Sequence, residues 1–227
     1  MTAPVLELIG VSKAYGALRP LRIERLVLQP GDEVALMGLD QPAAEMLVNL
    51  VTGASLPDSG QVRIFGTTTS DITDSAEWLP FLDRFGIVSD RSALLESMTL
   101  LQNLAVPFSL DIEPPSPEVA ARAAALAAEA GLSPALLSRR VADLDAPSLL
   151  RARLARALAL DPRVLLLEHP SATLPRPAVV PFAVTVRTLT EQRGLATLAV
   201  TADGEFAGAA STCALMLEPA TGRLKQL

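Results

Sequence analysis

The sequence is poor in several residue types on which particular classes of protein depend. It has one cysteine, Cys213, which excludes an internal disulfide framework and indicates a reducing compartment. It has two lysines, one histidine and a formal net charge of −6, a balance that disfavours a nucleic-acid-binding surface. No apolar run reaches the length of a membrane-spanning helix, and the first residues lack the basic start and apolar run of a signal peptide. We therefore expect a soluble cytoplasmic protein that binds no nucleic acid, does not insert into a membrane, and meets a membrane only through a partner.

What the sequence does have is a regular alternation of strand-like and helix-like segments. Half of its 227 residues are hydrophobic, and this length suits one α/β domain with a subdomain. Strand-like runs occupy residues 6–16, 22–38, 59–66, 85–90, 163–168, 196–200 and 214–218. Helices are predicted at about 42–51, through most of 92–143, at about 147–160 and at about 177–193. The pattern predicts a mostly parallel sheet that is covered on both faces.

The order of these segments resembles the nucleotide-binding subunit of an ATP-binding cassette (ABC) transporter over nearly the whole chain. Six stretches stand in the family's order and spacing, although none of its motifs is intact: residues 6–21, 28–38, 50–66, 85–108, 144–174 and 197–217. The resemblance implies an α/β fold of the P-loop NTPase, ABC type, in which a mostly parallel sheet is joined by N-terminal antiparallel strands and an inserted helical subdomain. It implies a single domain over 1–227, with 1–90 and 146–227 as the α/β core and 91–145 as the helical subdomain.

Residues 37–53, MGLDQPAAEMLVNLVTG, match the family's phosphate-binding Walker A loop in position but not in chemistry. The pattern G-x-x-x-x-G-K-[ST] supplies backbone N–H groups, a lysine for the outer phosphates and a hydroxyl for magnesium. Gly38 is kept, whereas Ala43, Ala44 and Glu45 replace the second glycine, the lysine and the hydroxyl. Each lost lysine contact costs about 1.5–3 kcal/mol, and a carboxylate near a phosphate adds about 4 kcal/mol of repulsion. We therefore expect nucleotide affinity to be lower by about four orders of magnitude.

The same loop can be satisfied without a phosphate. Asp40 or Gln41 is placed to cap the following helix, and Pro42 suits its first turn. We hypothesise that the carboxylate of Asp40 or Glu45 occupies the anion position itself.

The resemblance places other chemically unsuitable residues at the family's catalytic positions. Glu168 and His169 stand where an aspartate steadies magnesium and a glutamate polarises water, Asp90 stands at the Q-loop glutamine, and Ala202 at the switch histidine. The Glu168 side chain is one methylene longer than the usual aspartate. His169 is either a base near neutral pH or a solvent-facing or hydrogen-bonded side chain at a strand end. Tyr15 is either an adenine shelf or a packing residue.

The signature motif, which in the family contacts the phosphate held by the opposite subunit of a dimer, is also altered. Its positions are Asp145, Ala146, Pro147 and Ser148, so a negative charge would face that phosphate and the proline removes an N–H donor. Since the chain has lost both its Walker A and its signature contributions, even a heterodimer with an intact homologue would keep no complete site.

These observations favour a degenerate ABC transporter ATP-binding-protein-like subunit that does not hydrolyse ATP and acts as a structural or regulatory component of a membrane transport complex. We expect no cofactor and no metal. Expected partners are a transmembrane permease subunit, next to which residues 94–108 resemble the family's docking region, and a second ABC subunit in a homodimer or heterodimer. The protein would then be peripheral to the inner membrane. Two alternatives stay open: an unorthodox ATPase or nucleotide sensor that uses Tyr15, Glu168 and His169 with ATP and magnesium, and a repurposed binding module that shares only the fold.

Overall fold

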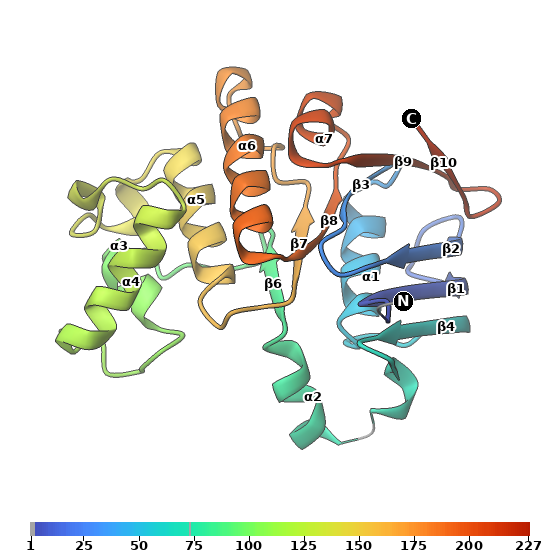
Figure 1. Cartoon of the computed structure of the whole chain (residues 1–227), viewed down its shortest axis with the longest axis horizontal. Coiled ribbons are helices and arrows are strands. Elements are labelled where there is room, and N and C mark those ends of the chain that lie inside the picture. The colour runs from blue at the N-terminus through green and yellow to red at the C-terminus, as the bar shows by residue number, and fades with distance from the viewer. Residues whose placement is uncertain (1–2, 73) are drawn as a thin grey trace.

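The computed structural model describes residues 3–72 and 74–227, which form two sheets flanked by helices (Figure 1). An antiparallel sheet has the order β2-β1-β4-β5. A second sheet has the order β10-β9-β3-β8-β7-β6, and all of its neighbouring strands are parallel except β10 and β9. The strands are β1 (Leu6–Lys13), β2 (Leu21–Leu28), β3 (Glu33–Met37), β4 (Ser59–Ile64), β5 (Thr67–Thr68), β6 (Phe85–Val88), β7 (Val164–Glu168), β8 (Ala196–Val200), β9 (Cys213–Glu218) and β10 (Arg223–Gln226).

Two interior strands of the parallel sheet are buried along their whole length. Every residue of β7 and β8 is buried, because helices or the other sheet cover both faces of the parallel sheet. This is why their sequences are continuous apolar runs rather than alternating ones. The mostly parallel sheet with N-terminal antiparallel strands is the architecture predicted from the sequence.

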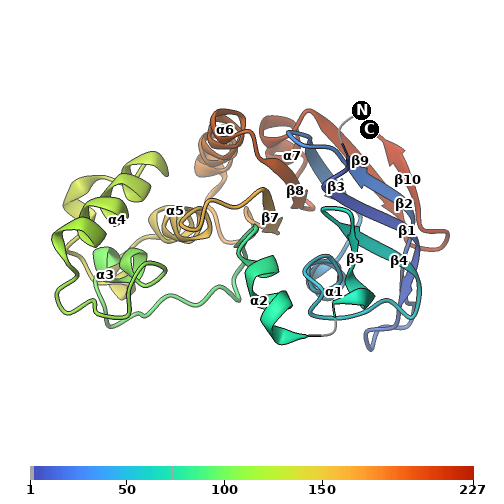
Figure 2. The same ribbon diagram turned by 60° about the horizontal axis from the view of Figure 1, so that its bottom comes forward.

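Helix α1 (Gln41–Val51) lies between the two sheets (Figure 2). Its buried side chains pack in one core with β1, β2, β4 and one face of the parallel sheet. The other face packs in a second core with α5 (Ala146–Ala157), α6 (Arg176–Arg193) and α7 (Gly204–Ala210). Helices α1 and α5 therefore lie on opposite faces of the parallel sheet.

A helical layer extends from the second core at the side away from the antiparallel sheet (Figure 1). It contains α3 (Leu100–Ala105), α4 (Pro117–Glu129) and 3-10 turns at Pro134–Leu136 and Val141–Asp143. The rest of residues 92–143 is loop and turn, so this region is less helical than predicted, in part because prolines interrupt it.

Several elements were not expected from the sequence, among them two helices and the last strand. Helices α2 (Ser75–Leu82) and α7 follow loops, and β10 continues beyond the strand that was predicted to be the last. Among the residues that the structure describes, no helix combines the length and the apolar character that crossing a membrane requires.

Candidate functional site

The candidate site lies at the carboxyl ends of β3 and β7, which are separated in the parallel sheet only by β8. Ligand sites of open α/β sheets form at this edge. Gly38 follows β3 and has a φ of +91°. A Cβ atom here would lie 2.7 Å from the carbonyl oxygen of Leu217 in β9, so both the backbone conformation and the close approach require glycine. The chain then needs only residues 38–40 to pass from β3 into α1.

The start of α1 uses its own backbone donors internally. The Oδ1 atom of Asp40 accepts the N–H of Ala43 at 2.9 Å, and the Asp40 carbonyl accepts the N–H of Ala44 at 2.9 Å. Pro42 has no N–H to offer. Of the two caps predicted, Asp40 and Gln41, the structure has Asp40. The Asp40 carboxylate thus accepts a hydrogen bond from an N–H at the helix N-terminus, and that N–H is no longer free to bind a phosphate.

An ion pair between a buried carboxylate and a partly exposed guanidinium stands beside this turn, at the end of β7. The side chain of Glu168 is fully buried, and both of its oxygens accept hydrogen bonds. Gln41 Nε2 donates to Oε1, and Arg91 Nη2 donates to Oε2 at 2.7 Å. The other terminal nitrogen of Arg91 lies 3.2 Å from Glu45 Oε1. One guanidinium therefore joins the carboxylates at two positions that the family resemblance assigned to magnesium ligation.

Arg91 is the residue of the candidate site that sequence reasoning missed. Its neighbour Asp90 was singled out instead, yet Asp90 turns away from this cluster and forms an ion pair with Arg153 of α5 at 2.5 Å. A signal was available, since a carboxylate at the end of an apolar strand must be paired with a cation if it is buried. Strands β6 and β7 are neighbours, so an arginine three residues after β6 lies within reach of the end of β7.

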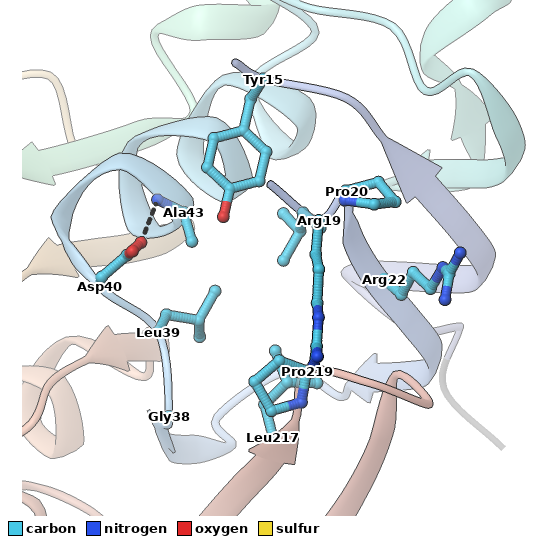
Figure 3. Close-up of a pocket in the computed structure, with 11 residues that line it drawn as sticks. Tyr15, Arg19, Pro20, Arg22, Gly38, Leu39, Asp40, Ala43, Leu217 and Pro219 are labelled. Atoms are coloured by element: carbon cyan, nitrogen blue, oxygen red, sulfur yellow. Dashed lines mark hydrogen bonds between the residues drawn. The ribbon is translucent and has the colours of Figure 1, made fainter. Parts of the chain in front are cut away.

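A cavity of about 190 Å³ opens on the other side of the Asp40 turn (Figure 3). Its lining includes Tyr15, Arg19, Gly38, Asp40 and Leu217. The hydroxyl of Tyr15 points into this space, toward the Asp40 turn, with the Arg19 side chain opposite (Figure 3). Burial and the charge of Asp40 both raise the pKa of Tyr15. The ring also packs against the core between the sheets, so Tyr15 fits the packing role and lines the cavity as well.

His169 and Ala202 line a different cavity, of about 540 Å³, at the ends of β7 and β8. His169 has a φ of +42°, an uncommon conformation for a non-glycine residue, and its N–H donates to the carbonyl of Val200 at 2.8 Å. Its Nε2 atom is buried and has no hydrogen-bond partner among the described residues. Ala202 contributes no polar side-chain atom.

The signature positions build the beginning of α5, on the face of the sheet away from α1. Asp145 caps this helix because its Oδ1 atom accepts the N–H of Ser148 at 2.8 Å. Hydrogen bonds from Ser148 to this carboxylate lower the pKa of Asp145. Ala146 and Pro147 form the first turn, where proline is well tolerated.

These residues do not fit a magnesium-bound triphosphate. No lysine or hydroxyl stands at the start of α1, and the place between Glu45 and Glu168 holds a guanidinium. No cluster of three or more histidine, cysteine, aspartate or glutamate side chains suited to a metal ion occurs in residues 3–72 and 74–227. The Tyr15 cavity, in contrast, offers an aromatic ring, apolar side chains and a cation, a combination that suits a nucleobase.

Comparison with known proteins gives consistent matches. The family model described as ABC transporter matches residues 25–172. The lipoprotein-releasing system ATP-binding protein LolD of Anaeromyxobacter dehalogenans is 30% identical over 228 residues, which cover 99% of this chain and 94% of that protein. The sulfate/thiosulfate import ATP-binding protein CysA of Gloeobacter violaceus is 32% identical over 219 residues, and the match spans only 60% of that protein.

Solved structures agree with these sequence matches at the level of the fold. The dimeric structure of MJ0796, a bacterial ABC transporter cassette, has a TM-score of 0.80 at 23% identity and 98% coverage of both chains. A second structure of MJ0796, in a post-hydrolysis state bound to ADP and Pi, has a TM-score of 0.79 at 23% identity and the same coverage. The fold class predicted from the sequence is confirmed.

One sequence-based expectation is contradicted, namely that the chain uses no cofactor. The similar proteins are named ATP-binding proteins, and one similar structure holds ADP and Pi. The expectation was drawn from the phosphate loop, whereas a nucleotide also has a base and a sugar that bind elsewhere. The Tyr15 cavity shares Ala43 with the altered loop, but its tyrosine, arginine and apolar side chains do not depend on the lost lysine and hydroxyl.

Proposed function

The chain belongs to the ABC transporter family, and from this premise we propose that it is the ATP-binding subunit of a membrane transport complex and that it holds nucleotide without hydrolysing it. Its role in the complex is then structural or regulatory. The family relationship itself matches the resemblance found in the sequence.

The observation that carries the proposal is the state of Glu168. Hydrolysis needs a carboxylate free to hold magnesium against the phosphates and a cationic clamp on the outer phosphates. Both oxygens of Glu168 are already engaged, one by Gln41 and one by Arg91. Ala44 stands where the phosphate lysine is expected, so the clamp is missing too.

Nucleotide binding is proposed at the Tyr15 cavity. Similar proteins are named for ATP binding, and the cavity supplies an aromatic ring with Leu39, Leu217 and Pro219 around it. Base–aromatic stacking contributes about 1–3 kcal/mol, independently of any phosphate contact. Arg19 adds a positive charge at the cavity wall.

The proposed membrane partner is a permease subunit, docked where the segment after β6 meets the helical layer. A cavity of about 310 Å³ lies there, lined by apolar side chains such as Leu94 and Leu149 together with the Asp90–Arg153 ion pair. The similar proteins are named for different cargoes, sulfate or thiosulfate in one case and lipoproteins in the other. Residues 1–90 and 146–227 are proposed as the α/β core, and 91–145 as the helical subdomain.

Two quantities measured on one sample test the proposal. Equilibrium displacement of a fluorescent ATP analogue by ATP reports binding, and steady-state phosphate release reports turnover. We expect ATP to displace the analogue without any release of phosphate. We expect Tyr15→Ala to weaken the affinity for ATP at least tenfold, the equivalent of about 1.4 kcal/mol. Magnesium-dependent phosphate release that disappears in Glu168→Gln would favour the unorthodox ATPase. Absence of displacement at millimolar ATP would refute the nucleotide-holding role.

A further inference from the structure

The Arg91 guanidinium occupies a position enclosed by acceptor atoms from two elements. Glu168 Oε2 of β7 is 2.7 Å from Nη2, while Glu45 Oε1 and Asn49 Oδ1 of α1 are 3.2 and 3.5 Å from Nη1. The guanidinium is a permanent cation with five donors in a fixed plane, so it can serve several oxygens at once. It is the positive charge that makes burial of the Glu168 carboxylate possible.

We propose that Arg91 is a tethered cation that takes the place of a divalent metal ion between α1 and β7. A metal ion entering this position would have to approach a guanidinium that already binds Glu168 and Glu45, and like charges repel strongly in a partly buried site. One consequence rests on the proposed function: the chain should bind its nucleotide equally well with and without divalent metal.

The chain contains a second cluster of nearly the same composition, which provides a matched control. Arg187 lies between the buried Glu33, at 3.7 Å, and the exposed Glu191, at 2.9 Å, while Thr190 donates to Glu33 at 2.9 Å. The exposed side-chain fraction is 40% for Arg91 and 41% for Arg187. The Arg187 cluster is located at the start of β3, the edge of the sheet opposite to the candidate site.

The first experiment uses metal alone, with thermal unfolding of the full chain in chelator, in excess magnesium and in excess manganese. We expect the wild type to unfold at the same temperature in all three. Arg91→Ala should unfold at a lower temperature in chelator and recover by about 5–10 °C in saturating metal, the shift expected of a bound ligand for a chain of this size. Arg187→Ala should lose stability without any recovery. Stabilisation of the wild type by metal, or an equal response of the two variants, would overturn the proposal.

A second variant covers the case in which Arg91→Ala does not fold. Arg91→Gln removes the positive charge but keeps a long side chain with an N–H donor for Glu168, so it should fold and bind manganese more strongly than the wild type, as measured by manganese electron paramagnetic resonance. No difference from the wild type in manganese binding would refute the proposal.

A third experiment, on nucleotide binding, distinguishes failure of this inference from failure of the proposed function. Displacement of the fluorescent analogue by ATP is compared in chelator and in magnesium, and we expect dissociation constants within twofold of each other. A tenfold tighter value in magnesium would overturn the tethered-cation inference while leaving nucleotide binding intact. The metal-only experiment, in turn, decides the inference even if the chain binds no nucleotide.

Discussion

Asp90 and Arg91 are adjacent in the chain, and their side chains form ion pairs on opposite sides of it. Asp90 pairs with Arg153 of α5, whereas Arg91 pairs with Glu168 of β7 and Glu45 of α1. The segment that follows β6 is therefore fastened both to the helical side of the molecule and to the candidate site. Loss of the Asp90–Arg153 pair should loosen the connection of this segment to α5, and loss of the Arg91 pairs should loosen its connection to β7 and α1.

The Arg91–Glu168 pair should be strongly coupled in stability. Arg91→Ala leaves a buried carboxylate without its cation, and we expect a loss of about 3 kcal/mol in the free energy of unfolding. Glu168→Gln in the same background removes the stranded charge and should recover part of that loss. A double-mutant cycle by denaturant unfolding checks this, and strictly additive effects of the two substitutions would contradict the pairing.

The single tyrosine of the chain allows its environment to be titrated directly. Burial and the negative charge of Asp40 both disfavour tyrosinate, so the pKa of Tyr15 is expected above its ordinary value of 10.0. Asp40→Asn removes the charge but keeps a good helix cap, so it should lower the Tyr15 pKa partway toward the ordinary value. Ultraviolet absorbance of tyrosinate measures both values. An unchanged pKa in the variant would show that the carboxylate does not face the ring.

Capping of α5 by Asp145 should give a pH-dependent contribution to stability. Asp145→Ala is expected to cost about 1 kcal/mol near neutral pH, and Asp145→Asn much less. The folded-state pKa of Asp145 is lowered by hydrogen bonds from Ser148, so the contribution is present above the unfolded pKa of about 3.9 and is lost as the pH falls through the folded value. Thermal unfolding of wild type and Asp145→Ala should converge in acid. A constant difference between them down to the lowest pH would argue against the cap.

Gly38 should be intolerant of substitution for a backbone reason. Gly38→Ala places a Cβ atom against the Leu217 carbonyl at a positive φ, and we expect a loss of at least about 1–3 kcal/mol. Gly204→Ala is the control, because that glycine has neither a positive φ nor a heavy atom in the path of a Cβ. Chemical denaturation of both variants provides the comparison, and equal stability would show that the β3–α1 turn relaxes freely.

The sequence predicted most of the framework because the relevant signals are local. The runs of β7 and β8 are apolar except for Glu168 and Thr197, and α1 was placed to within one residue because Asp40 and Pro42 mark a helix start. Strand β10 escaped prediction because its residues are largely exposed and its pairing depends on β9. Arg91 escaped because its acceptor, Glu168, is 77 positions away in the chain and no periodic pattern links them.

The most direct test of the central claim is a single-turnover assay, in which purified chain in excess is incubated with labelled ATP and magnesium. The account predicts that the ATP remains intact over many hours, at the rate seen in buffer alone, because no lysine clamps the outer phosphates and both oxygens of Glu168, at the family's magnesium position, are already engaged. Release of labelled phosphate that requires magnesium and is abolished by Glu168→Gln would contradict it, because the Arg91-bound carboxylate would then be a working catalytic group.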